Sequence, residues 1–345
     1  MSILSGGTDD FFGLDISPAS IQLVQLKPGD PKTLLRYASL PVEGTLAVSD
    51  SKADWPKLAA AIDQLIKQSG VTSKNVAVGI PSNRVFTSVI DMDKLPKEEL
   101  AQAIRFQADS IVPTPLAESK IDWALLGPSP RVPNQDEVIL TSVPNDYVEG
   151  RLDLLESIGL NVLAFEPNSL ALVRSLLPPD VSGVHMILEV GTLATDMIIT
   201  INGTIRLARS IPTGISALIR AASSALGINA TQASQFVHKF GLSHDKLEGQ
   251  VYEAIIGVVD NLIAEAQKSV KFFAGRYPGT KLDKVVLTGG ASTLPEFPLY
   301  VANKLGLNVE IGYAWANVAY PPDKQSELMG LSYKFAVAAG LAERE

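Results

Sequence analysis

The sequence contains no cysteine and only three histidines, His185, His238 and His244. The absence of cysteine excludes disulfides, thiolate metal sites and cysteine nucleophiles, and the histidines are too scattered along the chain to suggest a zinc site. This composition fits a protein of a reducing compartment, and we expect a cytoplasmic location.

Long apolar runs and basic runs are also missing. Residues 1–10 are rich in Ser, Gly and Asp and lack the basic and apolar regions of a signal peptide. No apolar stretch approaches the ~20 residues that a membrane span needs. Lys and Arg number 29 against 37 Asp and Glu, a formal net charge of −8, which argues against nucleic acid as the main partner. We expect a chain that is soluble or only peripherally attached to a membrane.

Two common nucleotide-binding motifs are absent as well. The sequence has no Walker A motif, and no Gly-x-Gly-x-x-Gly opens a helix, which disfavours P-loop and Rossmann folds. The length of 345 residues predicts about two domains. Hydrophobic residues make up 46% of the chain and charged residues 19%, so the chain has either a large core or an apolar surface that a partner covers.

The first half opens with predicted strands at residues 12–15, 21–26 and 33–40, the first two joined by the small-residue turn Ser17-Pro18-Ala19-Ser20. Further strands are predicted at 76–80, 84–92, 121–126, 138–143 and 160–165. Helices are predicted at 52–69, 97–110, 145–158 with Asn145 as its cap, and 168–177. Pro178-Pro179 then marks a domain boundary.

The second half repeats this order of elements. Strands are predicted at 185–190, 196–201, 204–211, 284–287 and 309–312, and helices at 214–226, 231–240, 247–276 and 295–305. The two halves therefore look related in architecture without being a close sequence repeat.

The strand-turn-strand segments near the start of each half carry the residue types of a phosphate-binding turn. Small residues let main-chain N–H groups approach phosphate oxygens, and a carboxylate at a strand end can hold hydrated magnesium. Taken alone, either segment has the composition of an ordinary hairpin turn. The occurrence of such a segment in both halves of the chain favours nucleotide binding. The candidate residues are Asp15, Ser17, Ala19, Ser20, Gly191, Thr192, Thr195 and Asp196 for the nucleotide, and Asp15 and Glu189 for magnesium held through water.

Three further places are candidates for the same chemistry. Gly289 and Gly290 follow an apolar strand and precede a helix, so a nucleotide sugar or phosphate can lie against their main chain. Glu166 either orients a water at the γ-phosphate or is a first-turn helix carboxylate. Glu265 and Lys268 stand at i, i+3 spacing, which fits a nucleotide contact or a solvated ion pair.

The order of these motifs resembles the superfamily of actin, the heat-shock chaperone ATPases and FtsA. Gly13-Leu14-Asp15-Ile16 looks like the first phosphate loop, Phe165-Glu166-Pro167 like the first connection, Glu189-Val190-Gly191 with Thr195-Asp196 like the second phosphate loop, and Thr288-Gly289-Gly290 like the adenosine loop. The resemblance implies an α/β, actin-like (RNase H-like) two-lobed ATPase fold that binds ATP or ADP with Mg²⁺.

Within that superfamily the chain is most similar to the PilM family of type IV pilus assembly, which shares an inserted subdomain with FtsA. The similarity rests on Ile80-Pro81-Ser82-Asn83-Arg84-Val85-Phe86, Ala103-Ile104-Arg105-Phe106-Gln107-Ala108, Arg209-Ser210-Ile211-Pro212-Thr213-Gly214 and Ala338-Ala339-Gly340-Leu341-Ala342. It implies a flexible tail at 1–10, a first lobe at 11–178 with the insertion at about 84–143, and a second lobe at 179–345 whose C-terminal helix returns to the first lobe.

The same resemblance implies a scaffold at the inner face of the cytoplasmic membrane. PilM proteins bind ATP between their lobes and capture the cytoplasmic N-terminal peptide of the inner-membrane protein PilN, and further pilus proteins or a second copy of the chain are expected as partners.

The sequence departs from the usual pattern of the superfamily at two positions in the phosphate loops. Pro18 supplies no amide donor, and Glu189 replaces the usual aspartate. We therefore expect ATP binding with weak or absent hydrolysis.

Two other members of the superfamily remain as alternatives. A sugar or acetate kinase needs a catalytic carboxylate on the substrate side, for which the sequence offers no convincing candidate. FtsA is expected to continue into a linker and a basic amphipathic membrane helix, whereas this sequence ends at Ala342-Glu343-Arg344-Glu345, directly after an apolar helix.

Overall fold

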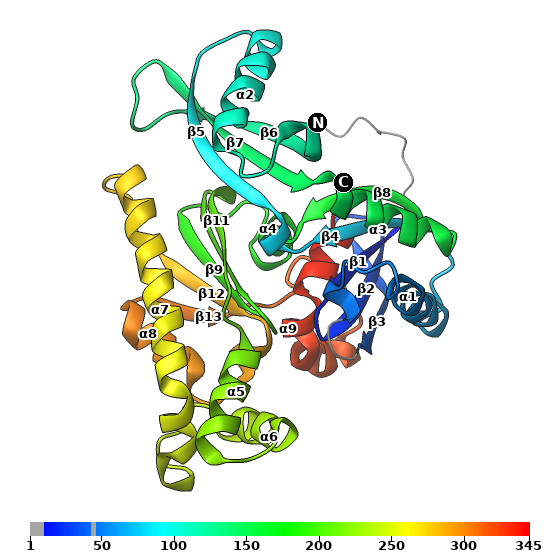
Figure 1. Cartoon of the computed structure of the whole chain (residues 1–345), viewed down its shortest axis with the longest axis vertical. Helices are drawn as coiled ribbons and strands as arrows, with labels where there is room; N and C mark the ends of the chain where they lie inside the picture. Colours follow the sequence, from blue (N-terminus) through cyan, green and yellow to red (C-terminus); the bar gives the residue numbers. More distant parts are fainter. Residues whose placement is uncertain (1–9, 43–45) are drawn as a thin grey trace. The chain divides into compact units, whose positions relative to one another are not determined.

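The computed structural model describes residues 10–42 and 46–345, so the tail expected at 1–10 lies, apart from Asp10, outside the described residues. The chain forms two compact units (Figure 1). Unit 1 contains the residues up to Pro179 together with Tyr313–Glu345, and unit 2 is Asp180–Gly312. The segment Tyr313–Glu345 belongs to unit 1; the sequence analysis assigned it to the second lobe, with the C-terminal helix returning to the first.

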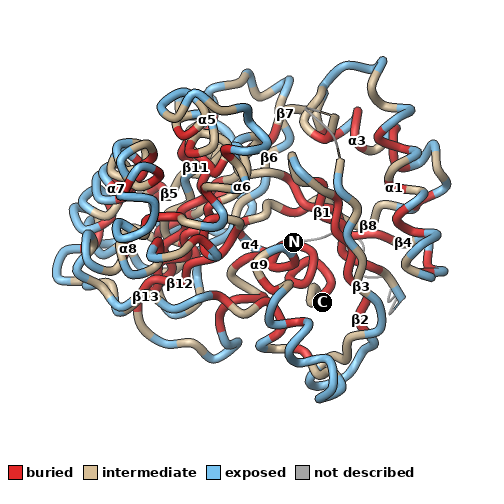
Figure 2. Tube along the Cα trace, turned by 90° about the horizontal axis from the view of Figure 1, so that it is seen from below, coloured by how far each residue is buried: buried red, intermediate tan, exposed pale blue. Residues whose placement is uncertain are grey.

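Unit 1 is built on a five-stranded sheet. Its strands are β1 (Phe12–Ser17), β2 (Ser20–Lys27), β3 (Thr33–Pro41), β4 (Asn75–Ile80) and β8 (Asn161–Pro167), in the order β3-β2-β1-β4-β8. The first three form an antiparallel meander, and β4 and β8 continue the sheet in parallel with β1. Parallel strands need a covering layer on both faces, and the burial of β1, β2 and β4 fits that requirement (Figure 2).

Helices cover both faces of this sheet. On one face, Phe12 and Leu14 pack with residues of α1 (Trp55–Ser69) and α3 (Asn145–Ser157). The other face is covered by α9 (Gln325–Ala342), which contacts β1, β2, β4 and α4 (Asn168–Leu176). The alternation of side chains along a strand explains this division, because neighbouring residues of β1 face opposite layers.

Two glycines let α9 approach closely. A Cβ on Gly13 of β1 would overlap the main-chain oxygen of Ala338, and a Cβ on Gly340 of α9 would overlap the main-chain oxygen of Ala171 in α4. Only glycine fits at such backbone contacts. The C-terminal helix is therefore packed against the sheet by main-chain contact as well as by apolar side chains.

The insertion between β4 and α3 forms its own small layer. Strands β5 (Phe86–Asp93), β6 (Ser119–Pro128) and β7 (Gln135–Pro144) make an antiparallel sheet in the order β5-β7-β6. Helix α2 (Lys97–Ile111) packs on it, and their shared core consists of Ile90, Met92, Leu100, Ile104, Ala108, Val138 and Leu140. A second cluster of Ile80, Val143 and Val148 joins the root of the insertion to β4 and α3.

Unit 2 repeats the sheet of unit 1. Strands β9 (Val184–Val190), β10 (Thr195–Ile201) and β11 (Thr204–Ile211) form an antiparallel meander, and β12 (Lys284–Thr288) and β13 (Asn308–Ile311) run parallel to β9. The order β11-β10-β9-β12-β13 is that of unit 1 with each strand replaced by its counterpart. The core also includes residues from α5 (Ile215–Leu226), α6 (Ala230–Phe240), α7 (Gln250–Arg276) and α8 (Phe297–Leu305).

Several predicted helix starts are wrong by two or three residues. Helix α1 begins at Trp55, where Pro56 occupies the first turn, and not at residue 52. Pro144, not Asn145, is the cap of α3, and the Asn145 side chain donates instead to the main-chain oxygen of Ala117. Short 3₁₀ turns, which the sequence did not predict, are η1 (Leu46–Val48), η2 (Ser82–Arg84), η3 (Leu116–Glu118), η4 (Leu247–Gly249), η5 (Gly290–Thr293) and η6 (Pro322–Lys324).

Within residues 10–42 and 46–345, each helix is too short or too polar to span a lipid bilayer.

Candidate functional site

The first predicted phosphate turn joins β1 to β2 in unit 1. Asp15 is buried near the end of β1 and accepts a hydrogen bond of 2.7 Å from Ser17 Oγ. Ser20 opens β2 and accepts a hydrogen bond from the Gln22 side chain. Ala19 at the tip is exposed, so the predicted small-residue turn is formed, with the carboxylate of Asp15 at its base.

The second predicted turn lies between β9 and β10 in unit 2, beside the N-terminus of α5. Gly191 N donates to Ala194 O at 3.0 Å, and the main-chain nitrogens of Ile215 and Ser216 donate to the oxygens of Gly191 and Thr192 at 2.9 and 3.0 Å. These bonds tie the turn to the first residues of α5. A Cβ on Gly214 would lie 2.6 Å from Gly191 O, so glycine is required there for the turn and the helix to meet.

The Gly-Gly turn lies next to this second turn. Gly289 has φ +81°, and a Cβ there would lie 2.5 Å from Val190 O. Its neighbour Thr288 pairs with Glu189 across the parallel strands β12 and β9. Unit 2 thus brings together two motifs that lie about a hundred residues apart in the sequence, because both follow the carboxyl ends of adjacent parallel strands.

Two carboxylates stand opposite each other in unit 2. Asp196 of β10 is the direct antiparallel partner of Glu189 of β9, and Asp196 is buried. Both oxygens of Glu189 are 3.2 Å from the place where a Cβ of Gly191 would lie. No cluster of three or more acidic or histidine side chains suited to a metal occurs in the described part of the chain.

Glu265 and Lys268 form an ion pair of 2.5 Å on α7, with Arg209 of β11 3.0 Å from the other carboxylate oxygen. The hydrogen bond from Lys268 keeps the pKa of Glu265 below its ordinary value, and Arg209 adds to this shift. Thr195, from the same predicted set, donates its hydroxyl to Thr213 O at 2.6 Å. The predicted contact of Glu265 and Lys268 with a nucleotide stays a prediction.

Glu166 is buried at the end of β8 and is held by two arginines. Arg174 Nη1 and Nη2 bind its two oxygens at 2.8 and 3.1 Å, and Arg344 Nη1 lies 2.9 Å from Oε2. Arg174 Nη1 also donates to Gly340 O at 2.5 Å. Both carboxylate oxygens of Glu166 are thus engaged by cations of α4 and of the residues after α9.

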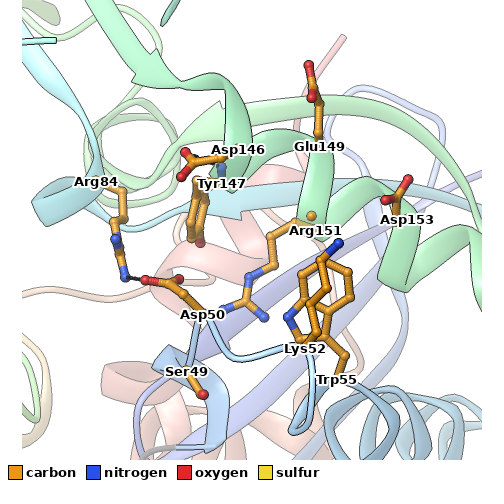
Figure 3. Close-up of a pocket in the computed structure, with 11 residues that line it drawn as sticks. Ser49, Asp50, Lys52, Trp55, Arg84, Asp146, Tyr147, Glu149, Arg151 and Asp153 are labelled. Atoms are coloured by element: carbon orange, nitrogen blue, oxygen red, sulfur yellow. Dashed lines mark hydrogen bonds and ion pairs between the residues drawn. The ribbon is translucent and has the colours of Figure 1, made fainter. Parts of the chain in front are cut away.

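A pocket lies at the root of the insertion in unit 1 (Figure 3), and none of the site residues predicted from the sequence lines it. Its volume is about 410 Å³. Its walls come from residues 49–55, which lead into α1, from Arg84 of η2, and from residues 146–153 of α3. The lining residues are Ser49, Asp50, Lys52, Trp55, Arg84, Asp146, Tyr147, Glu149, Gly150, Arg151 and Asp153.

Stacked cations and aromatic rings shape this pocket. Figure 3 shows Tyr147 between Arg84 and Arg151, whose guanidinium carbons lie 5.3 and 5.4 Å from the ring centre. Burial raises the pKa of Tyr147, although Arg151 and Arg84 oppose this shift. Lys52 lies 5.5 Å from the ring centre of Trp55. A cation at this distance from a ring is attracted by the negative face of the ring.

The walls are held by contacts that are distant in sequence. Arg84 Nη2 pairs with Asp50 at 2.5 Å, and Arg151 Nη2 donates to Ala47 O at 2.7 Å. A Cβ on Gly150 would lie 2.8 Å from Trp55 Cζ2, so the absence of a side chain there lets the indole rest on α3. No local motif links residues 47–55 to residues 84 and 147–151, so the residues that line this pocket could not be predicted from the sequence.

Comparison with known proteins identifies the family. Residues 13–345 match the family model described as type IV pilus assembly protein PilM. The chain belongs to the PilM family. A solved structure described as a PilM–PilN type IV pilus biogenesis complex is 25% identical to this PilM-family chain, covers 96% of it and 97% of the matched chain, and has a TM-score of 0.82.

More distant structures share the fold with this PilM-family chain. The ethanolamine utilization protein EutJ from Carboxydothermus hydrogenoformans is 15% identical over 96% of this chain and 88% of its own, with a TM-score of 0.56. MreB5 of Spiroplasma citri bound to ADP is 11% identical over 96% and 95%, with a TM-score of 0.54. The predicted α/β, actin-like ATPase fold and the predicted PilM family are thereby confirmed.

Proposed function

We propose that this PilM-family chain is a nucleotide-binding scaffold of type IV pilus assembly that binds the cytoplasmic N-terminal peptide of a PilN-like inner-membrane protein. The observation that carries the proposal is the family match over residues 13–345 together with the 25% identity and TM-score of 0.82 to the PilM–PilN complex. Binding to PilN recruits the chain to the inner face of the cytoplasmic membrane, where it meets other pilus assembly proteins.

The nucleotide is ATP or ADP, held by the two phosphate turns and the Gly-Gly turn. Asp15 and Ser17 in unit 1, and Gly191, Gly289 and Gly290 in unit 2, stand at strand ends where main-chain groups can approach a phosphate or a sugar. The nucleotide set also includes Ala19, Ser20, Thr192, Thr195, Asp196, Glu265 and Lys268.

Magnesium fits the chemistry of the carboxylates at these turns. Asp15 in unit 1 and Glu189 in unit 2 supply oxygen atoms of the kind that hydrated Mg²⁺ prefers. Asp196 stands opposite Glu189 on the neighbouring strand β10 and offers further oxygen atoms of the same kind. When bound, Mg²⁺ neutralises phosphate charge.

Hydrolysis is weak or absent in this proposal. Pro18 removes an amide donor from the first turn. Glu166, the candidate for water positioning, has both oxygens occupied by Arg174 and Arg344, and a general base must instead be within reach of the water it activates. The nucleotide therefore acts as a structural or conformational cofactor.

The pocket at the root of the insertion is the binding place that we assign to the partner peptide. It has aromatic walls formed by Trp55 and Tyr147, and charged groups at fixed positions. Aromatic anchors and a few fixed polar groups are typical of sites that bind a ligand with defined orientation.

Calorimetric titration of the folded protein, with ATP–Mg²⁺ and with the PilN N-terminal peptide in separate experiments, tests both parts of the proposal. We expect saturable binding of each. Asp15→Ala and Asp196→Ala should each abolish the nucleotide heat and leave the peptide heat unchanged, and Tyr147→Ala should do the reverse. Phe106→Ala, at a residue that is 86% exposed on α2 and lines no part of the pocket, is the matched control. Absence of both heats in folded protein would refute the proposal.

A further inference from the structure

Two buried carboxylates of unit 1 lie on the same face of its sheet, the face that α9 covers. A Cβ on Gly13 of β1 or on Gly79 of β4 would contact α9. Asp15 follows Gly13 by two residues on β1, so its side chain points to the same face. Glu166 is also on this face, because an arginine that binds its carboxylate donates to Gly340 O of α9 as well. Both carboxylates are at the carboxyl ends of parallel strands.

The register of the strands places Gly79 between these carboxylates. Gly79 pairs with Glu166 across β4 and β8. Leu14 pairs with Val78 across β1 and β4. The next residues along these two strands, Asp15 and Gly79, are therefore level with each other. Because neighbouring strands lie about 4.8 Å apart, the space over Gly79 is the gap between the two carboxylates.

The side chain of Asn168 fills this space. Asn168 is the first residue of α4, and a Cβ on Gly79 would overlap its Oδ1 atom. Oδ1 is covered and has no hydrogen-bond partner among the described residues, but the residue as a whole is partly exposed. The Nδ2 atom is not covered in this way and donates to no described residue. The amide therefore keeps a donor that a ligand can reach.

The neighbouring side chains of this row are engaged. Both oxygens of Glu166 are bound by arginines. Gln22, which pairs with Asp15 across β2 and β1, donates to Ser20 through its amide nitrogen. Asn168 differs from these neighbours, because its donor is accessible and stands next to the carboxylate that we assign to magnesium.

We propose that Asn168 Nδ2 donates a hydrogen bond to the terminal phosphate of ATP, and that this contact makes the site prefer ATP to ADP. The inference rests on the proposed function, because it takes a nucleotide with Mg²⁺ at Asp15 as the ligand. In P-loop and protein-kinase sites the metal bridges the β- and γ-phosphates. The γ-phosphate is the one that the position of Asn168 favours, because Glu166, the candidate for positioning a water at that phosphate, is its neighbour in the row. ADP lacks this phosphate and cannot make the contact.

One variant and a matched control test this role. Asn168→Ala removes the donor and suits the first turn of α4, because alanine has the highest helix propensity. Asn161→Ala is the control, because Asn161 begins β8 at the opposite edge of the sheet, where it is exposed and donates to Asn75. The wild type and both variants are titrated calorimetrically with ATP and with ADP in saturating Mg²⁺. Thermal unfolding followed by circular dichroism checks that each protein is folded.

We expect Asn168→Ala to bind ATP about tenfold or more weakly than the wild type, as loss of a hydrogen bond to a charged group predicts, and to bind ADP unchanged. Asn161→Ala should bind both nucleotides as the wild type does. A merely structural role of Asn168 would lower both affinities alike, so an unchanged ratio of ATP to ADP affinity would overturn this inference and leave nucleotide binding intact. A folded wild type that binds neither nucleotide would overturn the proposed nucleotide site as well.

Discussion

Glu166 and Arg344 lie 178 residues apart in the sequence, yet Arg344 Nη1 is 2.9 Å from Glu166 Oε2. Arg174 binds both oxygens of the same carboxylate and also donates to Gly340 O. This group of charges joins the end of β8 to the end of α9 within unit 1. The carboxylate is nearly inaccessible, whereas both arginines are partly exposed.

Glu166→Gln should therefore lower the stability of unit 1. The amide leaves two cations with a weaker partner at a buried position, and breaking a buried pair costs about 3–5 kcal/mol. The arginines keep access to water, so we expect a loss of about 2 kcal/mol. Urea unfolding followed by tryptophan fluorescence measures it, because the three tryptophans, Trp55, Trp123 and Trp315, all lie in unit 1.

Asp63→Asn is the control for that measurement. It removes the exposed pair between Asp63 and Lys67 on α1, which contributes at most about 0.5 kcal/mol. If Glu166→Gln changed the urea midpoint no more than this control does, the charged group would have no structural role.

Two glycines of α9 provide a matched pair of substitutions. Gly340→Ala places a methyl group into the main chain of Ala171, and overpacking of this kind should cost about 2 kcal/mol or more. Gly330→Ala, on the same helix, is exposed and meets nothing within 4 Å. It should raise stability by roughly 0.5–1 kcal/mol, because alanine favours a helix. Urea unfolding of the two variants with equal stability would contradict the close packing of α9 on α4.

Glu343 should make unit 1 less stable as pH rises towards neutrality. Burial raises its pKa from 4.5 to about 7, although Arg174 and Lys32 favour the charged form. The folded state therefore holds a proton that the unfolded chain releases between pH 4.5 and 7, and stability falls across that window and levels above it.

Glu343→Gln removes this dependence. The variant should match the wild type at about pH 4 and exceed it by on the order of 2 kcal/mol at pH 8. Urea unfolding at several pH values gives the difference. A difference in the free energy of unfolding between the two proteins that stays constant from pH 4 to pH 8 would show that Glu343 does not titrate in this window.

Much of the fold was readable from the sequence because local patterns determine its strands and helices. The predicted strand at 204–211 coincides with β11, where alternating residues meet a turn at Asn202-Gly203. The predicted helix boundaries were wrong where a proline or a residue of unusual backbone conformation lies near the end of the helix. The helix predicted from residue 295 begins at Phe297 as α8, because η5 and a residue at positive φ, Glu296, precede it. Such turns depend on contacts that no local pattern reveals.

Among the candidate sites, too, some features follow from local sequence and others depend on contacts between distant residues. The two small-residue turns, at residues 17–20 and 191–194, were predictable, because small residues and carboxylates follow one another directly in the sequence; their contact with phosphate stays a prediction. The residues that line the pocket were not predictable, because Asp50, Arg84 and Arg151 meet only after the insertion folds onto β4 and α3. The two arginines around Glu166 were missed for the same reason: Arg344 reaches it only because α9 packs against α4.

The Gly-Gly turn gives a matched test of nucleotide binding. Gly289→Ala forces a side chain into a backbone position of positive φ, 2.5 Å from Val190 O, beside the turn at Gly191 that we propose binds phosphate. Gly290→Ala meets only Ile215 Cδ1 at 3.8 Å. We expect Gly289→Ala to lose at least about tenfold in affinity for a fluorescent ATP analogue, because the strain displaces the turn. Gly290→Ala should lose less affinity for the ATP analogue. The reverse order would count against a nucleotide at this turn.

Calorimetric titration of the protein with the PilN N-terminal peptide tests directly whether the chain binds PilN. We expect saturable binding of one peptide per chain, lost in Tyr147→Ala and retained in Phe106→Ala. A folded chain that releases no heat with the peptide would refute PilN binding, and a Tyr147→Ala variant that binds the peptide as the wild type does would refute the assignment of the peptide to this pocket.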